Sequence, residues 1–176
     1  MKKIVAVVVL ALLALAPTAG AATFTDPDDM TSPLDIRKLT YTDEGHQVAT
    51  FVVVTDDNWR CSYIQPGLTS VKWLFDGRND GDVDLVGKTR CLNPAGPGRD
   101  LELFLSGRDT GNSYEPVPIK RPNRHTMKVT FSFDLVELRG PHASMFMKVK
   151  DGAAEGCTSA HKCTERAPDS GKWQLF

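Results

Sequence analysis

Apolar and polar residues alternate along most of the chain, and this period of two predicts β-strands. The clearest case is residues 126–133, where Met, Val, Phe and Phe share one face. The same alternation recurs at residues 71–75, 101–105 and 145–149, with Gly- and Pro-containing turns between the runs. The one predicted helical turn is a short connector at residues 134–138. About eight to ten short strands predict an all-β fold, a single antiparallel β-sandwich of jelly-roll-like type.

Two stretches depart from simple alternation. Residues 48–54 are apolar on both faces except at Thr50, which predicts a strand in the middle of a packed sheet. The strand that begins near Leu34 loses its pattern at Arg37 and Lys38. This slip predicts a β-bulge.

The N-terminus carries the pattern of a secretory signal peptide. Lys2 and Lys3 precede an unbroken apolar run over residues 4–16, and the small residues Ala19, Gly20, Ala21 and Ala22 follow. This order predicts cleavage after Ala21 or Ala22. The apolar run is shorter than the roughly 20 residues of a membrane-spanning helix. No second long apolar run follows, so we expect a secreted, extracellular protein without a membrane span.

Composition sets the size and class of the folded part. The chain has 176 residues, of which 41% are hydrophobic and 24% charged, which is typical of a globular protein. We expect a signal peptide at 1–21, one β-sandwich domain at 22–150 and a disulfide-tied C-terminal tail at 151–176. The net charge is −1, and removal of Lys2 and Lys3 makes it about −3. A near-neutral, slightly acidic protein gives no reason to expect nucleic acid as the partner.

Export makes disulfides the first interpretation of the four cysteines, Cys61, Cys91, Cys157 and Cys163. Three pairings are possible, and we favour Cys61 with Cys91 and Cys157 with Cys163, because the second pair brackets a short Gly- and Ala-rich loop. The alternative for the C-terminal pair is a zinc site formed by Cys157, His161 and Cys163.

The chain shows no catalytic motif. It has no Gly-x-Ser-x-Gly sequence, no phosphate-binding glycine loop and no His-Glu-x-x-His sequence. We interpret the four histidines (His46, His125, His142 and His161) as turn-forming or solvated residues. The sequence therefore favours a non-enzymatic protein, with a small secreted hydrolase as an alternative.

The densest polar cluster is a candidate calcium site. Asp76, Asp80, Asp82 and Asp84 fall at positions one, five, seven and nine of a calcium-binding loop when Gly81 is placed at position six. Arg78 and Gly87 at positions three and twelve depart from an EF-hand. The alternative is a polar hairpin in which Asn, Asp and Gly form the turn.

A second acidic stretch opens the mature domain. Asp26, Asp28 and Asp35 lie just before or within the first predicted strand. A cation bound by these residues would hold the N-terminal arm against the sandwich. The alternative is a solvated arm.

Several short motifs carry a family resemblance. They are Thr25-Asp26-Pro27-Asp28-Asp29, Pro33-Leu34-Asp35-Ile36-Arg37, Trp59, Phe75-Asp76-Gly77, Arg121-Pro122-Asn123-Arg124, and Cys163 followed by Ala167-Pro168-Asp169. With them the chain resembles a group of secreted bacterial β-sandwich proteins over most of residues 23–172. The resemblance implies the fold and the location and no activity.

The Asp-Pro-x-x-Asp opening is also distantly similar to DOMON-like domains and family-nine carbohydrate-binding modules. That resemblance implies sugar or haem binding, often with structural calcium. Sugar rings stack on flat aromatic faces, so Trp59, Tyr63 and Trp173 are the candidate ligand-binding residues, and a glycan or another cell-surface component is the candidate partner. Trp73 shares an apolar strand face and is expected in the core.

Overall fold

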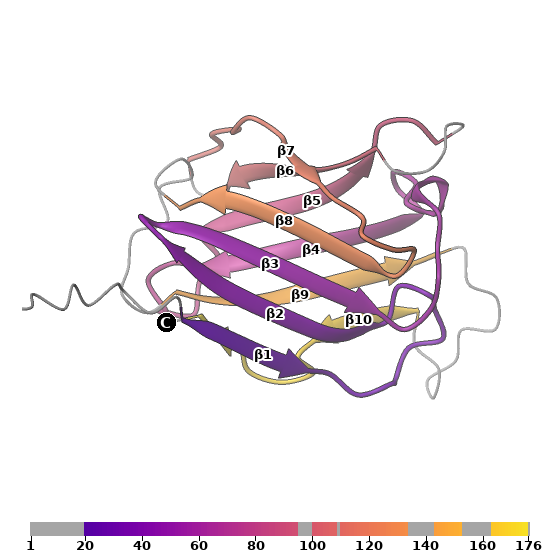
Figure 1. Cartoon of the computed structure of the whole chain (residues 1–176), viewed down its shortest axis with the longest axis horizontal. Coiled ribbons are helices and arrows are strands. Elements are labelled where there is room, and N and C mark those ends of the chain that lie inside the picture. Colours follow the sequence, from indigo (N-terminus) through magenta and orange to yellow (C-terminus); the bar gives the residue numbers. More distant parts are fainter. Residues whose placement is uncertain (1–19, 95–99, 109, 134–142, 153–162, 176) are drawn as a thin grey trace, which may run out of the picture.

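The structure is a computed structural model, which describes residues 20–94, 100–108, 110–133, 143–152 and 163–175. Two antiparallel sheets pack face to face, which confirms the predicted all-β sandwich (Figure 1). The described residues form eleven strands, slightly more than expected because two of them are only two and three residues long. A single 3-10 turn, η1 (Cys61–Tyr63), is the one helical element of these residues. In the same part of the chain, no helix has the length and apolar character to cross a membrane.

The smaller sheet has the order β1-β2-β3-β8. Its strands are β1 (Ala21–Thr25), β2 (Ile36–Gly45), β3 (Val48–Thr55) and β8 (Thr126–Ser132). The larger sheet has the order β10-β9-β4-β5-β6-β7, and β11 pairs with β9. Its strands are β4 (Thr69–Asp76), β5 (Leu85–Cys91), β6 (Leu101–Gly107), β7 (Val117–Ile119), β9 (Ser144–Asp151), β10 (Thr164–Ala167) and β11 (Trp173–Gln174).

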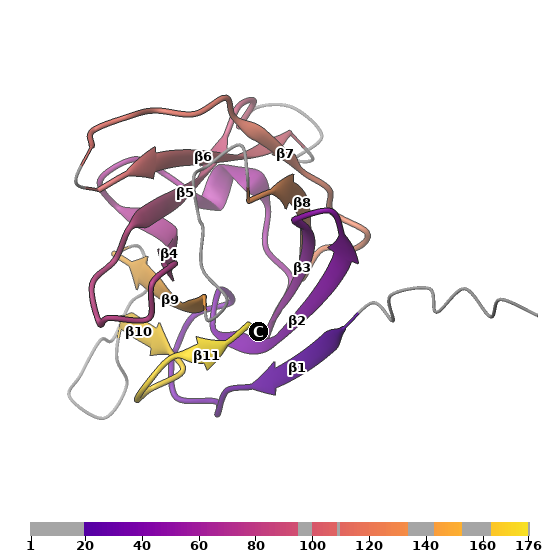
Figure 2. The ribbon, with the colours of Figure 1, turned by 90° about the vertical axis from the view of Figure 1, so that its left-hand side faces the viewer.

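Side-chain alternation sends one face of each sheet into a shared core. Figure 2 shows the two sheets facing each other. The predicted inward residues are buried in β4, β6, β8 and β9. In β2, the register shifts between Ile36 and Lys38, which confirms the predicted bulge. β3 lies between β2 and β8, as its apolar faces predicted.

Some boundaries differ from the sequence-based prediction or lie beyond the described residues. Residues 151–176 supply β10 and β11, so this segment is part of the larger sheet as well as a tail. The predicted cleavage positions, after Ala21 or Ala22, fall inside β1. The connector at 134–138, most of the signal peptide, and Cys157 and His161 of the alternative zinc site lie outside the described residues.

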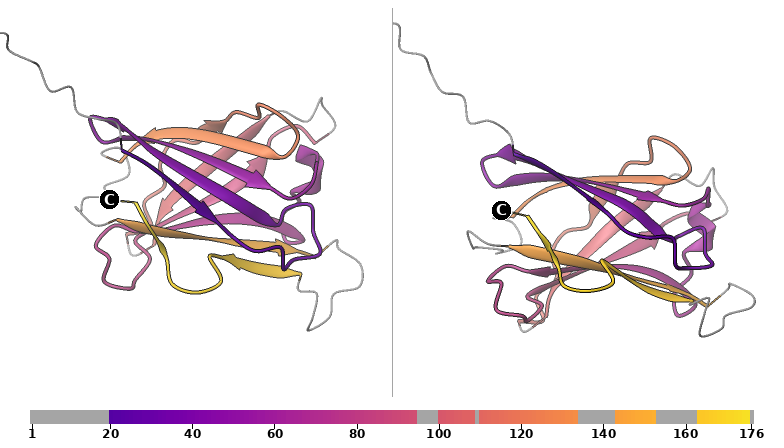
Figure 3. Two further views of the ribbon diagram at one scale, coloured as in Figure 1. Left: turned by 60° about the horizontal axis from the view of Figure 1, so that its bottom comes forward. Right: turned by 90° about the horizontal axis from the view of Figure 1, so that it is seen from below.

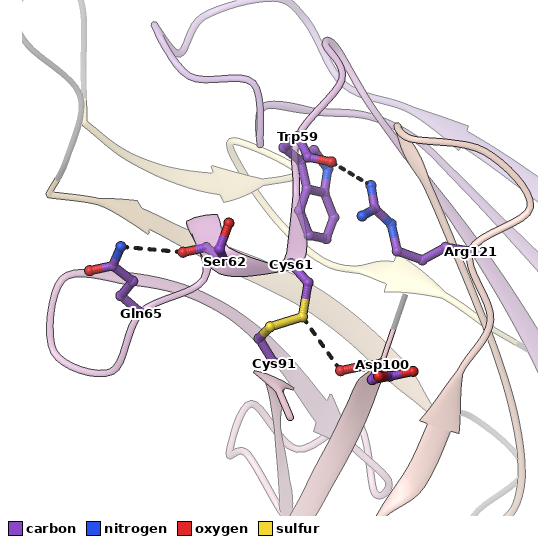
Figure 4. The surroundings of a disulfide bond; sticks show 7 residues. All are labelled: Trp59, Cys61, Ser62, Gln65, Cys91, Asp100 and Arg121. Carbon is purple, nitrogen blue, oxygen red and sulfur yellow. Dashed lines mark hydrogen bonds between the residues drawn. A yellow bond between two sulfur atoms is a disulfide. The ribbon is translucent and has the colours of Figure 1, made fainter. Parts of the chain in front are cut away.

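The predicted disulfide between Cys61 and Cys91 is confirmed (Figure 4). It joins η1 to the end of β5, and Cys61 is fully buried. The carbonyl oxygen of Asp100, just before β6, lies 3.4 Å from the Cys61 sulfur. Cys163 is also disulfide-bonded, and its predicted partner Cys157 is not among the described residues.

The two sides of the sandwich are closed by different interactions. Where β7 ends and β8 begins, Lys120 and Lys128 exchange two backbone hydrogen bonds of 2.8 Å, which link the sheets directly. On the opposite side, β1 lies along the C-terminal strands (Figure 3). There the Phe24 ring stacks on Trp173 with 5.7 Å between centroids. The Ile36 backbone N–H donates to the Glu165 carboxylate of β10.

Gly87 fits the core only because it has no side chain. A Cβ atom there would lie 2.8 Å from Leu103 Cδ1 and 3.1 Å from Trp73 Cβ. We therefore expect Gly87→Ala to lower the free energy of unfolding by about 1–3 kcal/mol through overpacking, measured by urea unfolding. In a Leu103→Ala background, the same substitution should cost less. Equal costs in both backgrounds would contradict this packing account.

The Cys61–Cys91 bond closes a loop with a sequence separation of 30 residues. In the chain-entropy model, removal of such a cross-link destabilises a protein by about 3–4 kcal/mol. We expect this loss for the double variant Cys61→Ala/Cys91→Ala, measured by urea unfolding under oxidising conditions. A double variant as stable as the wild type would contradict the expected role of the bond.

Candidate metal site

Three carboxylates converge where the N-terminal arm meets the larger sheet. Asp26, Asp29 and Glu165 each offer an oxygen, and these oxygens lie within 4.8 Å of one another. Asp26 and Glu165 are buried, and Asp29 is partly buried. In the described part of the chain, this is the one group of three or more such side chains with the spacing of metal ligands.

Local structure explains why these side chains meet. Asp26 directly follows β1 and precedes Pro27, which has no N–H to continue a strand ladder. In β10, Thr164 and Arg166 point outward, so the alternation turns Glu165 inward at the open side of the sandwich. The Glu165 oxygens accept the Ile36 backbone N–H at 3.2 and 3.3 Å, which fixes the carboxylate beside the arm.

Ionisation of the carboxyl groups in this cluster is electrostatically unfavourable. Burial raises the pKa of Glu165 to about 9, and the adjacent Asp26 and Asp35 add to the rise. Burial also raises the pKa of Asp26; a side-chain hydrogen bond with Glu165 opposes this rise, and the charges of Asp169 and Asp29 add to it. Asp26 Oδ2 is buried without a hydrogen-bond donor among the described residues. A buried oxygen of this kind favours a proton or a cation as its partner.

Two of the three acidic residues predicted at the arm lie beside the cluster. Of the predicted set Asp26, Asp28 and Asp35, only Asp26 belongs to it. Asp28 forms a 3.4 Å ion pair with Arg37. Asp35 is fully buried and accepts the Met30 backbone N–H at 3.3 Å, and burial raises its pKa to about 7.

The other predicted calcium loop is satisfied by groups of the chain itself. Asp76 accepts the backbone N–H groups of Asp80 and Gly81 and is paired with Lys172. Although burial opposes ionisation, the Lys172 ammonium and the backbone N–H groups of the turn, first that of Gly81, hold the Asp76 pKa below its ordinary value.

The remaining acids of this loop also have local partners. Asp84 accepts the Gly77 N–H at 2.9 Å and pairs with Arg78. Asp80 pairs with Arg78 and accepts the Asp82 N–H at 3.1 Å. These contacts are typical of a polar turn, the alternative interpretation, and Asp82 itself is exposed in it. The calcium site at this loop stays a prediction.

Buried acids near the C-terminal segment therefore differ in whether a base of the chain neutralises them. Asp76 is neutralised by Lys172, a base of the same chain. No ion pair between described residues involves Asp26 or Glu165. An ion from solution could therefore be bound at Asp26 and Glu165.

The three aromatic candidates for sugar stacking do not form an exposed surface. Trp59 is 3% exposed, and the Arg121 guanidinium covers its ring at 3.9 Å (Figure 4). Trp173 is 5% exposed and stacks on Phe24. The Tyr63 hydroxyl donates to Asp151 at 2.7 Å. Packing and hydrogen bonding therefore occupy these side chains.

The described histidines do not form a nucleophile–base pair. His46 lies in the β2–β3 turn with φ 53°, and His125 Nδ1 lies 3.4 Å from Asn58 Oδ1. Within the described ranges, neither ring is hydrogen-bonded to a hydroxyl or thiol. His142 and His161 lie outside those ranges.

Sequence reasoning missed Asp29 and Glu165 as members of the cluster. Asp29 belongs to the same acidic run as Asp26 and Asp28, and that run is a usable signal. Glu165 lies in a four-residue strand within the predicted tail. A single acid in so short a segment gives no sequence signal of burial.

Comparisons of the chain with models of protein families, with curated proteins and with solved structures found no match.

The cluster predicts an unusual pH dependence of stability in the presence of a chelator. Glu165 has a folded pKa of about 9 against an ordinary value of 4.5, so the folded state holds a proton that the unfolded chain releases. The free energy of unfolding should therefore fall as pH rises from about 5 to about 9. We expect Glu165→Gln, which does not ionise, to show a smaller fall, measured by urea unfolding with EDTA.

Asp80→Asn, a substitution in the exposed turn, should keep the wild-type pH slope. Asp35, with a pKa of about 7, also titrates in this range, so we expect a smaller fall in Glu165→Gln and not a flat profile. The same slope in wild type and Glu165→Gln would contradict the assignment of this proton to Glu165.

Proposed function

We propose that the protein is a non-enzymatic β-sandwich with a binding or structural role outside the cell, stabilised by a calcium ion at Asp26, Asp29 and Glu165. The observation that carries the calcium site is the convergence of three carboxylates, together with Asp26 Oδ2, which is buried and has no hydrogen-bond partner among the described residues. The ion would fasten the arm after β1 to β10, since the ligands come from both.

The chemistry of the cluster suits calcium. Calcium binds six to eight oxygens at about 2.3–2.6 Å, so two of its ligands lie at most about 5 Å apart. The oxygens of Asp26, Asp29 and Glu165 fall within this separation. Backbone carbonyls and water would complete the shell. Magnesium prefers a strict octahedron at about 2.0–2.1 Å and usually keeps several of its waters, so a set of several protein carboxylates favours calcium.

An extracellular location is supported by two independent features. The N-terminal sequence has the order of a secretory signal peptide. The buried Cys61–Cys91 disulfide is the kind of bond that persists in oxidising compartments. Calcium sites of extracellular modules are typically weak, with dissociation constants of about 10⁻⁴–10⁻³ M.

Calcium should raise the thermal stability of the protein. A ligand that binds the folded state at 100 times its dissociation constant adds about 2.7 kcal/mol, which is several degrees for a domain of this size. We expect this rise in Tm for the oxidised wild type, measured by circular dichroism, and its reversal by EDTA. Magnesium at the same concentration should give a smaller rise.

Matched variants locate the ion. Glu165→Gln and Asp26→Asn should lose most of the calcium-dependent rise, and Asp80→Asn should keep it, because Asp80 is paired with Arg78 in the turn. A rise lost in Asp80→Asn and kept in Glu165→Gln would move the ion to the turn. No rise in the wild type would contradict calcium binding altogether.

A further inference from the structure

A row of basic side chains crosses the outer face of the larger sheet. Lys72 of β4 lies directly opposite Lys88 of β5 on one side and Lys148 of β9 on the other. Lys148 in turn lies opposite Arg166 of β10. The alternation that turns Trp73 and Met147 into the core turns these four bases outward.

The same face holds further bases and little acid. Lys150 and Arg90 stand two residues from Lys148 and Lys88 along their strands, so they share the outward face. Glu102, opposite Arg90, is the acid on the neighbouring strand β6. Among the described residues, none of the six bases (Lys72, Lys88, Arg90, Lys148, Lys150 and Arg166) takes part in an ion pair.

This arrangement is unfavourable for the isolated protein. Like charges directly opposite each other on neighbouring strands destabilise a sheet, and Lys72 has a base on both sides. The whole chain carries a net charge of −1, so its composition does not impose this concentration of positive charge on one face. A costly row of this kind is typical of a surface that meets an opposite charge.

The aromatic rings of this face are covered by cations. The Arg90 guanidinium lies 3.9 Å from the centroid of Phe104, and that of Arg166 lies 4.3 Å from the centroid of Phe146. Proteins that bind single-stranded nucleic acid without sequence preference stack the bases on exposed aromatic rings. Because guanidinium groups occupy these ring faces, the surface presents charge rather than stacking area.

We propose that this face binds an anionic polysaccharide with a carboxylate on each sugar. Neighbouring strands are about 4.8 Å apart, so the row offers one lysine per strand in a line across β9, β4 and β5. Arg166 of β10 extends the positive charge at one end, where its guanidinium donates to the carbonyl oxygens of Pro168 and Gly171. A linear chain with regularly repeated single negative charges complements this spacing. The proposal rests on the extracellular binding role proposed above, and it is independent of the calcium site because the two use different residues.

The test is binding of polygalacturonate, measured by isothermal titration calorimetry in EDTA, so that calcium does not bridge the polymer and the protein. Lys72→Glu should weaken binding at least about tenfold, because it places a negative charge in the middle of the row. The same variant should raise Tm, since the introduced carboxylate would lie between Lys88 and Lys148. If Lys72 did not contact the polysaccharide, Lys72→Glu would raise Tm and leave binding unchanged.

Lys38→Glu is the matched control. Lys38 is exposed on the outer face of the smaller sheet, and its cross-strand neighbours Val54 and Thr25 carry no charge. This variant makes the same change in net charge, and we expect binding within about twofold of the wild type. Lys72→Gln, which removes the charge without reversing it, should weaken binding to a lesser degree than Lys72→Glu. Binding should also weaken as salt rises from about 0.1 M to about 1 M.

Several outcomes would overturn the proposal. If the wild type did not bind polygalacturonate at low salt, the basic face would be a solvated surface without this ligand. Equal losses in Lys72→Glu and Lys38→Glu would show a net-charge effect without a site. Equal binding of neutral dextran would exclude recognition of charge. Tighter binding of single-stranded DNA, or of vesicles rich in phosphatidylserine, would assign the face to nucleic acid or to a membrane. The calcium-dependent Tm shift would be unaffected by each of these results.

Discussion

The structure depends on how the two sheets are joined where β1 and β2 face β10 and β11. The other side is closed by backbone hydrogen bonds between Lys120 and Lys128. On this side, ring stacking of Phe24 on Trp173 and the bond from Ile36 to Glu165 make the join. The carboxylates of this side bring negative charge into a region of low dielectric, where it is costly unless it is paired. Closure therefore depends on how these acids are neutralised.

The chain has a solution of its own for one of them. Lys172 pairs with buried Asp76 and so ties the segment before β11 to the end of β4. Burial raises the pKa of both Asp26 and Glu165, that of Glu165 to about 9, so without a metal ion a proton neutralises Glu165 up to about that pH. In our account, calcium replaces this proton. Proton binding and calcium binding at the same carboxyl oxygens would then both change the stability of the protein. An arm fastened in this way would be secure only where the ion is plentiful.

The sequence was sufficient for the layout of the sandwich and insufficient for its closure. Alternation predicted β4, β6, β8 and β9, and the pattern slip at Arg37 predicted the bulge of β2. β10 and β11 have four and two residues, too few to show a period, so the burial of Glu165 could not be read. The burial of Trp59 beneath Arg121 depends on a contact between residues 62 positions apart. The alternation of apolar and polar residues indicates which face of a strand is buried. It does not indicate which distant residues cover the edge of that strand.

The most direct test of this account is a crystal structure of the oxidised protein grown with calcium chloride, with anomalous difference density used to identify the ion. We predict one peak with oxygens of Asp26, Asp29 and Glu165 at about 2.3–2.6 Å. Carboxyl groups hydrogen-bonded to one another at that position, with no peak between them, would contradict the claim that a cation closes this side of the sandwich.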